Sequence, residues 1–188
     1  MTSCSLTSPR DVGKANMITL SPLNEVKQSN KKLSNITIAY PLVPSELDTY
    51  RIAVIRADKR EDYFASVRWS EFLPAIIESN LKQTIANSKI FSQVQNDDKK
   101  SASDYILMTT VNDMKAIYYS DKKPPEIYIN ISFALKKGKN NLLIKEFNIQ
   151  KTIGLSENNI SSIARGFDKA FLLIQKELIE DISKNIKF

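Results

Sequence analysis

The chain has 188 residues, of which 42% are hydrophobic and 26% are charged, so it can bury a core of ordinary size and we expect one globular domain. It contains no histidine and one cysteine, which excludes an internal disulfide, the usual zinc sites, imidazole bases and Cys-His nucleophile pairs. The net charge of +6 comes mostly from lysines spread along the chain, a pattern that favours a lysine-rich soluble surface over a nucleic-acid or phospholipid site.

The N-terminal region differs in composition from the rest of the chain. Residues 5–33 are rich in Ser, Thr, Asn, Lys and Pro and have only scattered apolar positions, which predicts a flexible polar tether. Ile18–Leu20 could add a short edge strand to the domain. We therefore expect a tether over residues 1–33 and an α+β domain over residues 34–188.

The first half of the domain reads as strands followed by a helix. Runs of β-branched and aromatic residues predict three strands at residues 36–40, 50–57 and 62–69. Ser70 can then cap a helix that runs to about Ser88, with Pro74 still in its first turn. Trp69, just before this helix, is expected to fill the corner between strand and helix rather than to stack on a ligand. A short strand at residues 90–95 follows.

The second half reads as three strands followed by a long helix. Residues 105–119 are apolar, and residues 127–135 alternate strictly between apolar and polar, as a half-buried strand does. KKGKNN predicts a hairpin turn in which Gly138 takes a positive φ, and residues 142–150 return as a strand. Apolar residues then recur every three or four positions over residues 160–182, which predicts one amphipathic helix.

These elements predict the fold class. The order β-β-β-α-β-β-β-β-α, with no internal repeat, indicates a single α+β domain in which two amphipathic helices pack on one face of an antiparallel or mixed β-sheet. The four glycines are not clustered, so neither common phosphate-binding loop can form, and the chain does not look like an ATPase. No run approaches the ~18 consecutive apolar residues of a membrane-spanning helix. We expect no catalytic residue, no metal site and no cofactor.

One strand offers a candidate binding surface. If both helices cover the same side of the sheet, the polar face of the strand at residues 127–135 is left open. That face carries Tyr128, Asn130, Ser132 and Ala134, with Lys136 and Lys137 following at its rim. Because recognition surfaces favour aromatic residues and disfavour lysine, Tyr128 and Asn130 are predicted partner-contact residues. The alternative is a plain solvated sheet face.

Four segments, in the same order, resemble the ABC-type transport auxiliary lipoprotein family. They are YRIAVIRADKREDYFASVRWSEFLPAIIESNLKQTI, DYILMTTVNDMKAIYY, PPEIYINISFAL and IARGFDKAFLLIQKELIEDI. In the first, a strand and a charged turn lead to a tyrosine and then to Val-Arg-Trp ahead of an amphipathic helix. The resemblance spans about residues 36–182. It implies an outer-membrane lipoprotein partner of an MCE-type (paraquat-inducible-like) system, in which a separate ATPase, permease and MCE subunit move lipid between the membranes.

The start of the chain, MTSC, resembles the end of a lipobox, which implies that Cys4 is the lipidation site. Met1 stands where the motif usually has Leu, and the apolar region of a signal peptide is missing. Either the sequence was trimmed, or its start was assigned too late, or the match over four residues is coincidental. In this reading Ser5 fits sorting to the outer membrane, and the tether gives the domain a reach of roughly 30 Å.

The leading hypothesis is therefore a non-enzymatic auxiliary lipoprotein of an MCE-type ABC transporter, anchored through Cys4 at the periplasmic face of the outer membrane. Its expected partners are the MCE-type subunit or other transporter components, the membrane, and a second copy of itself. The alternative is a soluble cytosolic module that binds a small molecule or nucleic acid, with an incidental surface cysteine. A phosphate-binding module should lose affinity steeply as salt rises.

Overall fold

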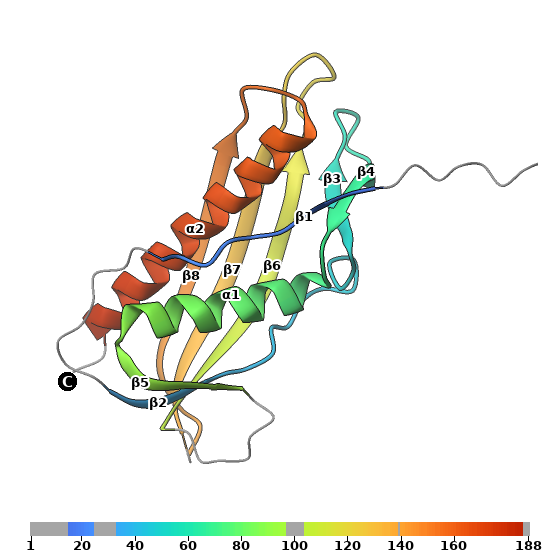
Figure 1. Ribbon diagram of the computed structural model, residues 1–188. Coiled ribbons are helices and arrows are strands. Elements are labelled where there is room, and N and C mark those ends of the chain that lie inside the picture. Colours follow the sequence, from blue (N-terminus) through green and yellow to red (C-terminus); the bar gives the residue numbers. More distant parts are fainter. Residues whose placement is uncertain (1–14, 25–32, 97–103, 139, 186–188) are drawn as a thin grey trace, which may run out of the picture.

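The structure is a computed structural model that describes residues 15–24, 33–96, 104–138 and 140–185 (Figure 1). Within these ranges the chain forms eight strands and two helices. The strands are β1 (Asn16–Ile18), β2 (Leu33–Ile38), β3 (Arg51–Ile55), β4 (Glu61–Trp69), β5 (Phe91–Asn96), β6 (Tyr105–Ile117), β7 (Glu126–Lys137) and β8 (Leu142–Gly154). The helices are α1 (Leu73–Ser88), between β4 and β5, and α2 (Ile160–Asn185), after β8. The predicted order is confirmed from β2 onward, and β1 precedes it.

The strands form one mixed sheet with a long antiparallel centre. β6 pairs with β7 and β7 with β8, both antiparallel. The other edge of β6 is shared, because its first residues pair with β2 and its last residues with β3, both in parallel. β5 extends the sheet beyond β2, and β4 and then β1 extend it beyond β3. The expected α+β class with a mixed sheet is confirmed.

Both helices cover the same face of the sheet, as predicted (Figure 1). Phe167 and Phe171, one turn apart on α2, are fully buried in the core. Trp69 at the end of β4 is also buried, and its ring meets that of Phe167 edge-on with 5.2 Å between centroids. Trp69 is therefore a core residue, as predicted, although the ring that it contacts belongs to α2 rather than to the helix that follows it.

The start of α1 differs from the prediction. The cap residue is Phe72 rather than Ser70, and among the described residues no side chain caps the helix. Ser70 instead donates its backbone N–H to the C=O of Ile18 at 2.8 Å, which continues the pairing of β1 with β4. Pro74 does lie in the first turn, where its missing N–H costs no helix hydrogen bond.

The hairpin between β7 and β8 also differs in one detail. No described glycine has a positive φ, and the left-handed residue of this turn is Asn141, with a φ of 51°. Asn141 donates its N–H to the C=O of Gly138 at 3.0 Å. Asparagine is among the residues that enter this region most readily, so it takes the place that the sequence suggested for glycine.

The described part of the predicted tether belongs to the folded domain. Residues 16–18 form β1 beside β4, two positions before the edge strand expected at Ile18–Leu20. Residues 19–24, which we call the N-terminal strap, then run between α1 and α2 (Figure 1, blue). Leu20 of the strap is buried in the core. The domain therefore begins before residue 34, and Cys4 lies outside the described residues.

Candidate partner-binding face of the sheet

The predicted contact residues lie on the sheet face opposite the helices. Along β7, fully buried residues alternate with half-buried ones, and Tyr128 and Asn130 are among the half-buried set. The buried set (Ile127, Ile129, Ile131, Phe133 and Leu135) packs toward α2. Because both helices lie on that side, the side chains of Tyr128 and Asn130 point to the face that the helices leave uncovered, as expected. We call it the open face.

A network of side-chain amides crosses the open face. Asn112 of β6 donates from Nδ2 to Asn130 Oδ1 at 3.3 Å and to Ser132 Oγ at 2.7 Å. Asn148 of β8 donates from Nδ2 to the same two oxygens, at 3.1 and 2.9 Å. Asn130 and Ser132 on the central strand are therefore held from both sides. The network joins three strands and fixes polar side chains without using any charge.

Tyr128 is oriented by a separate hydrogen bond on the same face. Its phenol O–H donates to Gln150 Oε1 of β8 at 3.2 Å. Lys136 at the far end of β7 is half-buried, and Lys137 after it is exposed. The two predicted contact residues and the two predicted rim lysines thus follow one another along one strand.

An open hollow of about 510 Å³ lies on this face beyond the amide network. Its lining includes Met108 and Thr110 of β6, Ala134 and Lys136 of β7, and Glu146 of β8. The hollow therefore combines apolar surface with one cation and one anion. Such a surface can receive a side chain or loop of a partner, since it offers both contact area and hydrogen bonds.

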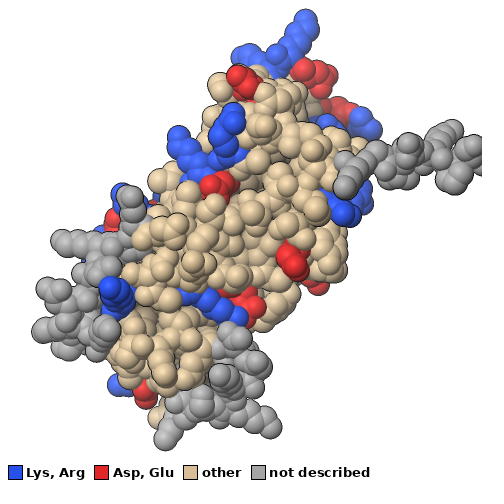
Figure 2. Space-filling model, viewed as in Figure 1, with Lys and Arg blue, Asp and Glu red and all other residues tan. Residues whose placement is uncertain are grey.

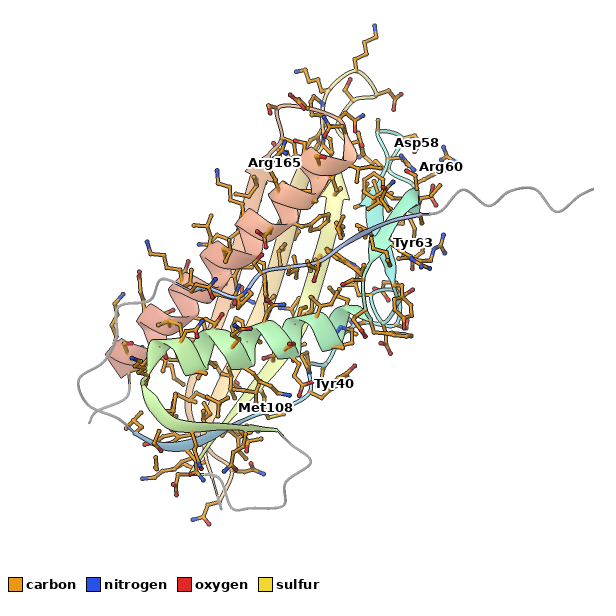
Figure 3. All side chains as sticks on the ribbon, viewed as in Figure 1. Tyr40, Asp58, Arg60, Tyr63, Met108 and Arg165 are labelled. Atoms are coloured by element: carbon orange, nitrogen blue, oxygen red, sulfur yellow. The ribbon has the colours of Figure 1, made fainter. Side chains whose placement is uncertain are left out.

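A second part of the open face lies where β3 pairs with β4 on one side and with β6 on the other. Tyr63 of β4, which belongs to this part, is labelled in Figure 3. The ring of Tyr63 on β4 is covered by the guanidinium of Arg51, whose Cζ is 3.9 Å from the ring centroid. The Tyr63 hydroxyl donates to the C=O of Glu46 at 2.9 Å. Next to it, Lys115 and Asp113 of β6 form an ion pair at 2.6 Å. These paired groups make this part of the face more charged than the amide network.

Sequence reasoning did not find Asn112 or Asn148. Their place beside Asn130 depends on the register of β6 and β8 against β7, and Asn112 sits at an irregularity between Val111 and Asp113. One signal was available: Ser132 and Asn148 are polar residues of strands that a hairpin joins, and they lie opposite each other, so the hairpin geometry could have brought Asn148 to this face.

Two groups with shifted pKa values are the phenol of Tyr118 and the carboxylate of Asp58. Burial raises the pKa of the Tyr118 phenol, which donates to Asn158 Oδ1 at 2.6 Å. At the tip between β3 and β4, a hydrogen bond from the Arg60 side chain lowers the pKa of Asp58 (Figure 3). In the described ranges no three or more His, Cys, Asp and Glu residues group as metal ligands. Neither described helix is long and apolar enough to cross a membrane.

The chain shares its fold with solved structures of low sequence identity. No protein-family model and no curated protein matches it. It is similar to protein XCC0632 from Xanthomonas campestris, described as a member of family DUF330, at TM-score 0.71 and 17% identity over 88% of this chain and 91% of the other. It is also similar to an uncharacterized protein, at TM-score 0.65 and 11% identity over 89% of this chain and 99% of the other. A third similar structure is the hypothetical protein CT253 from Chlamydia trachomatis, at TM-score 0.53 and 10% identity over 82% of this chain and 95% of the other.

Proposed function

We propose that this protein is a non-enzymatic lipoprotein that assists an MCE-type ABC lipid transporter. In this proposal Cys4 carries the lipid anchor and holds the domain at the periplasmic face of the outer membrane. The open face, with Tyr128 and Asn130, contacts the MCE-type subunit or a second copy of the chain. The protein binds and positions its partner, while other subunits hydrolyse ATP and move the lipid.

The observation that carries the proposal is the resemblance in four segments along the chain. In the structure these segments make up β3, β4, β6 and most of α1, β7 and α2, so they include the centre of the sheet and the larger part of both helices. The shared fold with a DUF330 protein over 88% of the chain is consistent with a relationship of whole domains. The open face adds a surface whose chemistry suits binding, since its amides and hydroxyls are neutral and already oriented.

The anchor is tested on the gene with its upstream region. Translation in frame before Met1 should add about 15–20 residues with a basic start and an apolar run. The protein expressed from this gene should fractionate with the outer membrane, and mass spectrometry should find acyl chains on Cys4. A Cys4→Ser variant is the matched control and should lose both properties. Recovery of an unmodified wild-type chain in the soluble fraction would exclude the anchor.

The open face is tested by placing the same charge on this face and at a second exposed tyrosine. Tyr128→Glu, with or without Asn130→Lys, should weaken self-association in light scattering and co-purification with the transporter. Tyr119→Glu is the matched control, because Tyr119 is 70% exposed in the connection after β6. Each variant must keep the wild-type melting temperature, since Asn130 accepts two hydrogen bonds. Equal assembly of the Tyr128 and Tyr119 variants would show that the open face is not the interface.

A further inference from the structure

The N-terminal strap is bound through its backbone by side chains of both helices. On the α2 side, Ser21 donates its N–H to Asp168 Oδ1 at 2.7 Å. The C=O of Ser21 accepts a hydrogen bond from Gln175 Nε2 at 2.9 Å. Side chains of α2 therefore form hydrogen bonds with both the backbone N–H and the backbone C=O of Ser21.

The same arrangement recurs two residues later on the α1 side. Leu23 donates its N–H to Thr84 Oγ1 at 2.9 Å, and its C=O accepts from Asn87 Nδ2 at 3.1 Å. Pro22 between them has no N–H to satisfy. Ser21 is thus held from α2 and Leu23 mainly from α1, although the Leu23 N–H also lies 3.4 Å from Gln175 Oε1, so the strap is bonded from both sides. Side chains of the two helices here form the hydrogen bonds to the backbone that a neighbouring strand would form in a sheet.

The helix side chains involved are costly to bury without a ligand. Thr84 and Gln175 are both 0% exposed, and besides the hydrogen bond from Thr84 Oγ1 to Gln175 Oε1 they bind the strap. Without an extended chain between the helices, the amide of Gln175 would lose the acceptor that it has in Ser21. The apolar part of the contact is small, since only Leu20 of the strap is fully buried. The four side chains Thr84, Asn87, Asp168 and Gln175 are called the inter-helix site below.

We infer that the inter-helix site is a binding site for extended polypeptide and that it also accepts the strap of a second copy of this chain. Every copy carries the sequence TLSPLN, which satisfies all the contacts described above. Nine peptide units join Asn24 to Leu33, the first residue of β2, and they can span up to about 30 Å. The strap can therefore leave its own site, together with the preceding β1, while β2 stays paired. Exchange between copies replaces each contact with an identical one, which makes it a low-cost route to dimers.

The surroundings of the site carry charges of both signs. Figure 2 shows this side of the molecule, and its middle is largely free of charged side chains. The hollow beside Leu23 of the strap is lined by Arg165, Lys169 and Lys176 together with Asp168. Two copies facing each other here would meet repulsion between these cations, which salt screens. The inference does not depend on lipidation of Cys4 or on the open face.

The test is a disulfide that can form only between copies. In a Cys4→Ser background, one chain carries Asn24→Cys and a second carries Asn87→Cys, because the side chains of Asn24 and Asn87 are in contact in the structure, with Asn87 Nδ2 3.2 Å from Asn24 Oδ1. Mild oxidation of the mixture should give at least ten-fold more linked dimer than a control mixture of Asn24→Cys with Lys122→Cys. Lys122 is exposed in the connection between β6 and β7. Both changes in one chain should give an internal disulfide, which shows that the two positions can react.

Efficient internal linkage together with a mixed-chain yield no higher than the control would overturn the inference, because the strap would then be a permanent part of its own chain. A second measurement leaves the site unmodified. A fluorescent peptide of residues 16–24 should bind the Cys4→Ser chain saturably in anisotropy titrations, and the same peptide with Leu20→Asp should not. Equal binding of the two peptides, or binding of neither up to millimolar concentration, would likewise overturn the inference.

Discussion

Gly166 is where α2 comes closest to the sheet, and its replacement by alanine tests that packing. A Cβ atom at this position would lie 2.5 Å from Leu155 Cδ2 and 2.8 Å from Ile127 Cγ1. Ordinary contacts between carbon atoms are about 3.5–4.0 Å. Leu155 is half-buried and can move, but Ile127 is fully buried in the centre of the sheet. Gly166→Ala should therefore push α2 away from β7.

The expected magnitude is the difference between two opposing effects. Alanine is favoured over glycine in a helix interior by about 1 kcal/mol. Overpacking of a filled core typically costs about 1–3 kcal/mol, and two contacts below 3 Å place this site in the upper part of that range. The net loss in free energy of unfolding should be about 1–2 kcal/mol, or a fall in melting temperature of about 2–8 °C for a chain of this size.

The assay is thermal and urea unfolding followed by circular dichroism, with Gly154→Ala as the matched control. A Cβ atom at Gly154, at the end of β8, meets no atom within 4 Å. Its φ is not in the left-handed region, so alanine there should be neutral or should stabilise by up to about 1 kcal/mol. A Gly166→Ala variant as stable as wild type, or two variants with the same stability, would refute the close approach of α2.

Three further predictions concern the core, a buried phenol and the strap. Phe171→Ala should cost about 3–5 kcal/mol because it empties a fully buried site, whereas Lys169→Ala on the exposed side of α2 should be nearly silent in the same melts. Tyr118→Phe should cost about 1 kcal/mol at pH 7. Burial raises the pKa of Tyr118 in the folded protein, so its contribution to the free energy of unfolding is fully present below its ordinary pKa of 10.0 and is lost as the pH rises beyond the raised value. The melting temperatures of wild type and Tyr118→Phe should therefore converge at alkaline pH. Asp168→Ala should speed amide hydrogen exchange at Ser21, and unchanged exchange would contradict the strap contact.

The sheet centre and the long helix could be predicted because their signal is local. β7 alternates strictly, and α2 repeats its apolar residues every three or four positions, so periodicity alone gave both the elements and their buried sides. The same alternation placed Tyr128 and Asn130 on the open face. Their contact with a partner stays a prediction.

The strap could not be predicted, because its stability comes from residues far away in the sequence. Its only fully buried side chain is Leu20, and its composition resembles a linker. Its hydrogen-bond partners lie 61 to 154 positions later in the chain, on two helices whose separation depends on the whole fold. Ser70 was misassigned for a related reason: pairing with β1 continues as far as Ser70, and the helix begins only at Leu73, with Phe72 as the cap residue.

Docking of β1 and the strap would also limit how far the domain can lie from a lipid on Cys4. About twelve peptide units separate Cys4 from Asn16, the first residue of β1, so a fully stretched chain allows about 40 Å. With the strap and β1 released, the next fixed point is Leu33, about 29 units from Cys4, and the limit rises to about 100 Å. A pull on the lipid would first load the three-residue pairing of β1 with β4. Release of β1 and the strap would thus increase the greatest distance between the bilayer and the domain.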